Sequence, residues 1–394
     1  MYTVIADDLT GAAEIGGVAL RYGLKAEVHI GHPGVGTAEV RVIDTDTRSR
    51  HPRKATRRLA ELARTLAAEA TPGIFKKVDS VLRGPILAEL RALLPALGRP
   101  RALVVPSSPS RGRIITGGKY RIKGRLIHHT DFQKDPEYPI RSPDVVKMLQ
   151  PWEGAPTPRV LTLEAKWPET GIFIGEASSR QEMLAWAGKL DEKTLPAGSA
   201  EFFAAVLQQR HPCHLRELKP PRDSCPAGNL FLVSGSASLQ SRQSIEDFER
   251  TGIPVLPMPL PLFKGTENPK QWLRQWARAV EQAFQTCRCV VVHIGQPVAT
   301  DRERATAPSR YLAQVWGTVL GDCPVAHLCI EGGSTASRLV RHLGWSQFQV
   351  YAEIEPGILC LRRPGEPSPL LTLKPGSYPW PAAFLATPQR GMGY

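Results

Sequence analysis

Short apolar runs recur along the first half of the chain, and polar stretches with a helical spacing separate them. The runs predict strands at residues 2–6, 26–30, 40–44, 74–78 and 101–106, with helices at 12–23, 54–70 and 85–96. In the second of these helices, Leu59, Leu62 and Leu66 lie on one apolar face. Strands that alternate with helices indicate an α/β domain with a mainly parallel sheet, whose binding site lies at the carboxyl ends of the strands.

The same pattern begins again after a Pro-rich, polar stretch at 211–228. Strands are predicted at 230–233, 289–294 and 326–330, the first of them followed by a turn at 235–238 and a helix. The sequence therefore predicts two α/β domains with mainly parallel sheets, residues 1–228 and residues 229–394, joined by a linker.

Two segments of the first half lack a clear strand or helix pattern. Residues 107–145 are rich in Gly, Pro, Ser and basic side chains, which predicts a long irregular loop of the kind that usually has a function. Residues 195–211 are interpreted as a turn followed by a helix.

Composition places the chain among ordinary globular proteins. Of its 394 residues 42% are hydrophobic and 22% charged, which excludes a disordered or fibrous protein. No apolar run reaches the roughly 18 residues that a membrane helix needs. The N-terminus has Asp7 and Asp8 where a signal peptide has its basic and apolar regions. We therefore expect a cytoplasmic protein without membrane contact.

The net charge favours anionic partners, since 50 Lys and Arg against 37 Asp and Glu give +13. Residues 99–130 contain eight of these basic residues and no acid. Such a stretch is typical of a nucleic-acid-binding loop, of the rim of a pocket for small anions, or of a solvated surface. Tyr120 is the only aromatic residue in it, so stacking on single-stranded nucleic acid is poorly supported, and we expect no nucleic-acid partner.

The seven cysteines all follow residue 212. Cys289, Cys329 and Cys360 lie in apolar, strand-like runs, where a free thiol packs as a small hydrophobe. Cys287 and Cys289 lack a second pair at the spacing of zinc ligands. The sequence therefore predicts reduced, buried thiols and no metal site.

Two motifs of the first half combine charges at predicted strand ends. ADDLTGA places Asp7 and Asp8 where a carboxylate can accept a proton from a hydroxyl, hold Mg²⁺, or cap the next helix. We expect one of the two acids to be a cap and the other to be functional. KKVDSVLRG contains Lys77, which can neutralise a phosphate, and Arg83, whose planar fork matches a carboxylate. A capped helix start with scattered charges is an equally good interpretation of this second motif.

Two Gly/Ser turns follow predicted strands of the second half, at 233–238 and 331–336. Small residues there let a backbone approach a ligand, and N–H groups of the next helix can bind phosphate. Neither turn is a P-loop or a dinucleotide-binding fingerprint. Two such turns in one α/β domain favour a nucleotide site of another kind.

Together these motifs resemble those of the four-carbon acid sugar kinase family. The resemblance rests, in chain order, on ADDLTGA, KKVDSVLRG, HTDFQKDPEYPI at 129–140, LPAGS at 195–199, SGSAS at 234–238, EGGSTA at 331–336 and LKPG at 373–376. It implies two α/β domains with the active site in the cleft between them. The first domain would take the sugar acid and the second ATP with Mg²⁺. The implied reaction is phosphorylation of the terminal hydroxyl of a threonate-, erythronate- or 3-oxo-tetronate-type acid.

By position, the resemblance implies a sugar-acid site built on Asp8 and Arg83 and supported by Asp7, Lys77 and Asp79. The nucleotide contacts that it implies come from Ser234, Ser236, Gly332, Gly333, Ser334, Thr335 and Gly376. On this basis we predict that Asp8 orients or deprotonates the attacking hydroxyl and that Lys77 neutralises the transferred phosphoryl group. Arg83 would clamp the substrate carboxylate, with Lys77 or Arg113 as the next candidate.

The chain also departs from the family pattern. Family members usually have an acid at the position of Ser334, and KSGxFG where this chain has KPGSYP at 374–379. An alternative hypothesis is therefore a regulatory protein that binds sugar acid and nucleotide but has lost efficient phosphoryl transfer. A homodimer is a further expectation.

Overall fold

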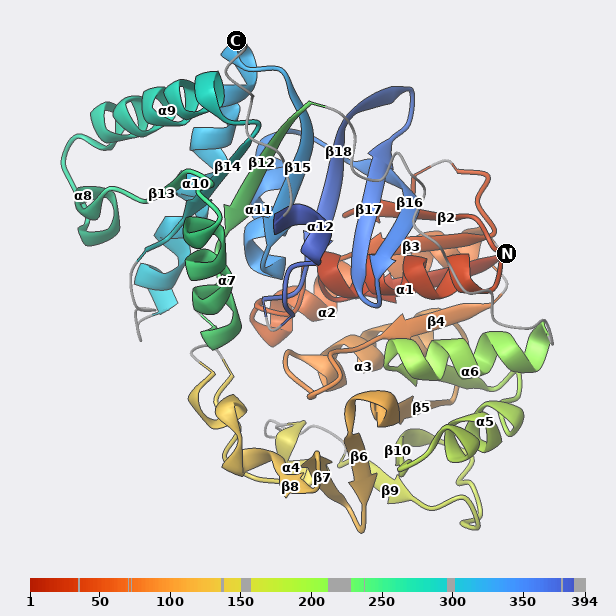
Figure 1. The fold of residues 1–394 in the computed structure, drawn as a ribbon. Coiled ribbons are helices and arrows are strands. Elements are labelled where there is room, and N and C mark those ends of the chain that lie inside the picture. The colour runs from red at the N-terminus through yellow and green to blue at the C-terminus, as the bar shows by residue number, and fades with distance from the viewer. Residues whose placement is uncertain are drawn as a thin grey trace. The chain divides into compact units, whose positions relative to one another are not determined.

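In the computed structural model the chain divides into two compact units, Met1–Glu217 and Leu218–Tyr394. The structure describes residues 1–34, 36–69, 71, 73–135, 138–149, 157–211, 228–236, 238–295, 302–376 and 378–385. The domain boundary that the sequence predicts, at residue 228, adjoins a segment, 212–227, that lies outside these residues. Each unit is an α/β structure (Figure 1). Among the described residues, no helix combines the length and apolar character needed to cross a membrane.

The first unit is built on a parallel sheet with the strand order β2-β3-β1-β4-β11-β5-β10-β9. Its strands are β1 (Tyr2–Ala6), β2 (Ala26–Ile30), β3 (Val40–Asp44), β4 (Ile74–Lys77), β5 (Arg101–Val105), β9 (Arg159–Leu161), β10 (Gly171–Gly175) and β11 (Thr194–Gly198). Because the strands are parallel, the segments that follow β1, β3, β4, β11 and β5 all lie along one edge of the sheet.

Helices cover both faces of this sheet, as the right-handed crossovers of parallel strands require. They are α1 (Leu9–Arg21), α2 (Pro52–Ala68), α3 (Ile86–Ala96), α5 (Arg180–Gly188) and α6 (Ala200–Arg210). Helix α6 packs against α1 and α5, whereas α2 packs against α3 (Figure 1). Leu59, Leu62 and Leu66 of α2 are buried in a core with α3 and the sheet, which confirms the predicted apolar face.

Residues 107–145 are not the irregular loop that the sequence predicts. They contain a small antiparallel sheet of β6 (Arg113–Thr116), β7 (Lys119–Ile122) and β8 (Arg125–Leu126), followed by the short helix α4 (Val145–Met148). Tyr120 and Ile115 of this sheet are fully buried in the core that α2 and α3 share. The segment is compact because alternate side chains of its short strands point inward, a pattern that its basic residues hide in the sequence. We call residues 107–149 the insertion.

The prediction of a turn at the start of 195–211 was also incorrect. Residues Thr194–Gly198 form β11, a central strand between β4 and β5. Pro196 and Gly198 disfavour a strand by propensity, but a side chain at Gly198 would lie 2.2 Å from the Val105 carbonyl oxygen. Glycine is therefore required where these two strands approach closely, and Ser199 then caps α6.

The second unit has the strand order β13-β14-β12-β15-β18-β17-β16, with the first five strands parallel and the last two antiparallel. Its strands are β12 (Asn229–Ser234), β13 (Val255–Pro257), β14 (Cys289–His293), β15 (Val325–Glu331), β16 (Gln347–Glu355), β17 (Ile358–Arg363) and β18 (Glu366–Lys374). Its helices are α7 (Leu239–Arg250), α8 (Leu260–Lys264), α9 (Pro269–Thr286), α10 (Arg302–Asp322), α11 (Gly333–His342) and α12 (Ala382–Leu385). The restart of the α/β pattern after residue 228 is confirmed.

Most of the described cysteines of the second unit are buried, as the sequence predicts, but Cys323 is only partly buried. Cys289, Cys329 and Cys360 are buried in β14, β15 and β17, and none of them forms a disulfide within the described residues. Cys287 is likewise free and buried. Cys213 and Cys225 lie outside the described residues. The thiols therefore contribute to the apolar core.

Candidate active site

The edge of the first sheet where β1 ends carries the two acids of ADDLTGA. Asp7 is the first residue after β1, and Asp8 is the N-cap of α1, its Oδ1 accepting a hydrogen bond from the Gly11 backbone N–H at 2.8 Å. One of the two acids is a cap, as predicted, but it is Asp8, the acid that the resemblance implies for the attacking hydroxyl. That the other acid is the functional one stays a prediction. The Asp7 side chain is only 1% exposed, whereas that of Asp8 is 15% exposed. Asp8 is thus the acid that a ligand can reach.

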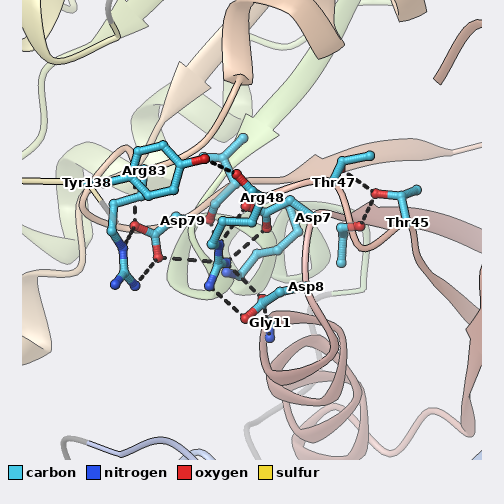
Figure 2. Close-up of polar contacts among 12 residues, drawn as sticks. Asp7, Asp8, Gly11, Thr45, Thr47, Arg48, Asp79, Arg83 and Tyr138 are labelled. Carbon is cyan, nitrogen blue, oxygen red and sulfur yellow. Dashed lines mark hydrogen bonds and ion pairs between the residues drawn. The ribbon is translucent and has the colours of Figure 1, made fainter. Parts of the chain in front are cut away.

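Arg48, which the sequence analysis did not single out, links these acids (Figure 2). Its Nε and Nη2 donate to Asp7 at 2.8 and 3.0 Å, and its Nη1 and Nη2 donate to Asp8 at 2.6 and 2.8 Å. Nη2 also lies 3.7 Å from Asp79 Oδ1. Arg48 follows β3, and its N–H donates to the Asp7 carbonyl at 3.2 Å, which ties the two strand ends together. One guanidinium therefore lies among three carboxylates.

Asp79 and Arg83 form a second tight pair at the end of β4. Arg83 Nε and Nη2 donate to the two Asp79 carboxylate oxygens at 2.8 and 2.9 Å, and Nη1 donates to Asp135 at 3.0 Å. The backbone N–H of Arg83 also donates to Asp79, at 3.2 Å. The planar fork that the sequence analysis assigned to a substrate carboxylate is therefore occupied by Asp79 in this structure.

The adjacent acids have pKa values that shift in opposite directions. Burial alone would raise the pKa of Asp7, but Arg48 and Lys76 outweigh it and hold this pKa below its usual value. Burial raises the pKa of Asp8, and repulsion from Asp7 adds to this, so that Arg48 offsets the rise only in part. Neighbouring carboxylates whose pKa values are shifted in opposite directions are typical of sites with one fixed anion and one proton acceptor.

A buried polar layer lies behind Asp7. Lys76 Nζ and Glu89 Oε2 form an ion pair at 2.9 Å, and neither side chain is more than 1% exposed. The Thr47 hydroxyl donates to the other oxygen of Glu89, and Thr45 contacts Thr47 at 2.8 Å. A buried ion pair of this kind is weak evidence for stability, because desolvation opposes its attraction. Glu89 is linked through Thr47 to the turn that carries Arg48, and Lys76 helps to lower the pKa of Asp7.

Lys77 lies on the α1 side of the same strand end. Its Nζ donates to the Val78 carbonyl at 3.0 Å and lies 3.5 Å from Glu14 of α1. A Cβ on Gly11 would be 2.7 Å from Asp8 Oδ1 and 3.2 Å from Lys77 Nζ, so only glycine lets these two side chains share the start of the helix. The structure thus brings together all five residues that the sequence analysis assigned to the sugar-acid site.

The insertion contributes to this same site. Tyr120 donates its hydroxyl proton to the Ser80 carbonyl, and Tyr138 donates to the Arg48 carbonyl. Arg111 lies 3.3 Å from Glu14, and Arg113 donates to the Ser80 hydroxyl at 2.5 Å. Arg111 and Arg113 therefore lie at this site, whereas Lys119, Lys123 and Arg125 of the same segment are exposed.

In the second unit the two Gly/Ser turns and the loop after β18 lie against each other. Gly235 N donates to the Glu331 carbonyl at 3.0 Å, and Gly332 N donates to the Lys374 carbonyl at 3.0 Å. A Cβ on Gly235 would lie 1.8 Å from Thr335 Oγ1, and one on Gly376 would lie 2.3 Å from Ser236 Oγ. The predicted nucleotide residues Ser234, Ser236, Gly332, Gly333, Ser334, Thr335 and Gly376 therefore belong to three adjacent turns.

A second buried ion pair supports these turns. Glu331 and Lys374 are fully buried, with Oε1 and Nζ 2.7 Å apart. Lys374 also donates to the carbonyls of Pro375, at 3.1 Å, and Tyr378, while Ser241 joins Glu331 to the Gly376 carbonyl. Ser234 Oγ and Glu331 Oε2 are buried without a partner in the described part of the chain. Unpaired buried oxygens of this kind are uncommon in folded proteins.

Comparison with known proteins shows the family to which the chain belongs. Residues 2–183 match the family model of a sugar-binding N-terminal domain, and residues 231–378 match the family model of a nucleotide-binding C-terminal domain. The chain belongs to the four-carbon acid sugar kinase family. The resemblance on which the sequence analysis relied is therefore confirmed.

Curated members of this kinase family align with almost the whole chain. The chain is 27% identical to a D-threonate kinase of Cupriavidus necator, over 97% of this chain and 96% of the relative. It is 25% identical to a 3-oxo-tetronate kinase of Pseudomonas fluorescens, over 95% and 93%. A D-erythronate kinase of Heliobacterium modesticaldum is 38% identical over 35% of this chain and 33% of its own length. The relatives thus differ in the acid for which they are named.

Solved structures share the fold of this family member at lower identity. A Salmonella typhimurium protein has a TM-score of 0.76 at 17% identity and covers 98% of this chain, with 97% of its own length aligned. A Haemophilus influenzae protein has a TM-score of 0.68 at 20% identity and covers 95%, with 96% of its own length aligned. These matches confirm the α/β fold class.

Proposed function

We propose that this protein is an ATP- and Mg²⁺-dependent kinase that phosphorylates the terminal hydroxyl of a four-carbon sugar acid of the threonate, erythronate or 3-oxo-tetronate type. The observation that carries this proposal is the Asp7–Arg48–Asp8 cluster at the end of β1, in the unit that matches a sugar-binding domain. The names of the relatives support the substrate class and leave the particular acid open.

In this proposal Asp8 is the group that accepts the proton of the attacking hydroxyl. It is more exposed than Asp7, and its raised pKa makes its carboxylate the stronger base of the two. Arg48 holds it in a fixed orientation, since both carboxylate oxygens accept from the guanidinium. Asp7 is the fixed anion that keeps Arg48 in place. Catalysis then consists mostly of positioning and electrostatic stabilisation, as is usual for phosphoryl transfer.

Lys77 is proposed to neutralise charge on the transferred group. Its ammonium lies beside the Asp8 carboxylate across Gly11, so a phosphoryl group approaching the substrate hydroxyl would meet it. Its acidic contact, Glu14, is 3.5 Å away and is shared with Arg111. This pairing is loose enough for Lys77 to interact with a second anion.

The nucleotide is proposed to bind the three turns of the second unit. The glycines at 332 and 333 begin α11, where backbone N–H groups favour phosphate. The unpaired Ser234 and Glu331 oxygens fit a ligand with hydrogen-bond donors. ATP supplies the phosphoryl group when bound. Asp7 is buried and gives both of its carboxylate oxygens to Arg48, so Mg²⁺ would be held mainly by the ATP phosphates.

The regulatory alternative keeps the two binding sites and lacks turnover. Its support is the absence of the family's usual acid at Ser334 and of its KSGxFG motif at 374–379. The loop at 374–379 is still held in place, since Lys374 forms an ion pair with Glu331. The discriminating experiment measures ADP release with each four-carbon acid, with and without Mg²⁺. Release that requires both the acid and Mg²⁺ supports the kinase. Binding of acid and ATP without ADP release supports the regulator.

A further inference from the structure

A sugar acid carries a negatively charged carboxylate. The basic side chains around Asp8 differ in whether they already form an ion pair with a carboxylate of the protein. Among the described residues of this site, the basic side chains are Arg48, Lys76, Lys77, Arg83, Arg111 and Arg113. The first five each lie within 3.5 Å of a carboxylate oxygen. Arg113 lies within ion-pairing distance of no carboxylate among the residues that the structure describes, and its charge is unmatched by contact.

The Arg113 guanidinium is nevertheless held in a fixed place. Nη1 donates to the neutral Ser80 hydroxyl at 2.5 Å, and the guanidinium carbon lies 5.6 Å from the centre of the Phe132 ring. Its backbone N–H donates to the Ser108 carbonyl at 3.0 Å, and its carbonyl accepts from the Ser108 N–H at 2.8 Å. An arginine that is already oriented loses little conformational entropy when it binds an anion.

Arg83 lies near the same ring and shows the contrasting case. Its guanidinium carbon is 5.9 Å from the Phe132 ring centre, but its three donor nitrogens contact Asp79 and Asp135. A substrate carboxylate could reach the fork of Arg83 only by displacing Asp79. Arg113 would lose no ion pair on binding a carboxylate.

Arg113 also belongs to the chain of contacts that contains Asp8. Ser80, which accepts from Arg113, adjoins Asp79, and Asp79 lies 3.7 Å from the Arg48 nitrogen that donates to Asp8. Burial would raise the pKa of Glu14, a residue of α1, but Lys77, Arg111 and then Arg113 outweigh it and lower this pKa. A four-carbon sugar acid has its carboxylate at one end and its terminal hydroxyl at the other. Such a substrate needs a cation for the carboxylate and Asp8 for the hydroxyl in one site.

We propose that Arg113 binds the substrate carboxylate, and that Arg83 positions Asp79 and the Asp135 turn. This inference rests on the proposed function, since it assumes a sugar acid as the ligand. In this assignment Phe132 packs near both guanidinium groups.

The test compares Arg113→Met and Arg113→Lys with the wild type in acid binding, measured by calorimetry on the full chain without nucleotide. The probes are D-threonate, D-erythronate and the matching tetritols, in which a neutral hydroxymethyl group replaces the carboxylate. We expect Arg113→Met to weaken acid binding roughly 30-fold or more, and Arg113→Lys to weaken it less, because lysine keeps the charge but loses the fork. Neither variant should change tetritol binding.

The matched control is Arg121→Met, which removes a basic side chain of the same small sheet that donates only to the Gly124 carbonyl in this structure. It should leave acid binding unchanged, and all variants should keep the wild-type melting temperature and ATP affinity. If the wild type binds an acid and Arg113→Met binds it equally well, the inference is overturned and the proposed function stands. If the wild type binds neither acid of this panel nor a 3-oxo-tetronate measured in the same way, the proposed function and the inference are both overturned.

Discussion

Arg48 and Asp8 form a two-point ion pair at the start of α1, with Nη1 2.6 Å from Oδ2 and Nη2 2.8 Å from Oδ1. Asp8 Oδ1 also caps the helix through Gly11. The Asp8 carboxylate therefore caps the helix and is also held in a fixed orientation by Arg48 (Figure 2). A purely structural cap would not need Arg48, whose own position depends on Asp7 and on the turn after β3. We propose that this pairing orients Asp8 for a role in the reaction.

Replacing Asp8 tests this role without removing the cap. Asn is as good an N-cap as Asp, so Asp8→Asn should keep the melting temperature close to that of the wild type. It should lower kcat by about 10² to 10⁴, since an amide cannot accept the hydroxyl proton. ATP affinity should be unchanged. Asp144→Asn, the same change at the N-cap of α4, is the control and should leave kcat unaltered. A near-normal kcat for Asp8→Asn would mean that Asp8 is only a cap.

The pH profile should show the raised pKa of Asp8. Burial and repulsion from Asp7 raise this pKa above its ordinary value of 3.8, so the basic form is lost as the pH falls through the raised value. We therefore expect kcat/KM for the acid to fall on the acid side with an apparent pKa above 3.8. Lys77 lowers the pKa of Asp8, so Lys77→Met should shift this limb to higher pH. A limb that moves to lower pH, or not at all, would contradict the assignment.

Gly333 tests the nucleotide site. It is the first residue of α11, and a branched side chain there should obstruct a phosphate group that approaches the helix N-terminus. Gly333→Val should therefore raise the KM for ATP by about tenfold or more, with little change in the KM for the sugar acid. Initial rates over both substrates measure the two constants. Equal increases would indicate misfolding in place of a local effect on ATP.

The Glu331–Lys374 pair should behave as a buried unit. Removing either charge leaves the other buried without a partner, so Lys374→Met and Glu331→Gln should each cost about 3–5 kcal/mol of unfolding free energy. The double variant should cost less than the sum, as a double-mutant cycle in urea will measure. The exposed pair Lys119–Asp144 is the control, and Lys119→Met should cost no more than about 1 kcal/mol. Additive losses in the buried cycle would show that the two charges do not interact.

Much of the fold followed from the apolar pattern. The strands at 2–6, 26–30 and 40–44 have the predicted bounds because continuous apolar runs mark strands that are buried on both faces. The antiparallel strands β6–β8 were missed, since their few buried residues, such as Tyr120, alternate with basic ones. β11 was missed because its Pro196 and Gly198 resemble a turn, although close strand packing requires the glycine.

The candidate site was predictable where its charged residues belong to short sequence motifs. Asp7, Asp8 and Arg83 follow strands that the sequence marks clearly, and Lys77 is the last residue of one. Arg48 was missed, although it also lies just beyond a predicted strand, at 40–44. The polar run after that strand was a usable signal, because the carboxyl ends of parallel strands share one edge. The occupied fork of Arg83 could not be predicted, since it depends on tertiary contacts with Asp79 and Asp135.

The most direct test of the kinase assignment is the phosphorylation of four-carbon acids by the purified full chain, followed by ADP release and by ³¹P NMR of the product. We predict ADP release that requires both Mg²⁺ and a sugar acid, and a new phosphomonoester on the terminal carbon of that acid. Asp8→Asn should form neither product at a comparable rate. If the wild type binds ATP and the acid but yields no phosphomonoester, the account of this protein as a kinase is contradicted.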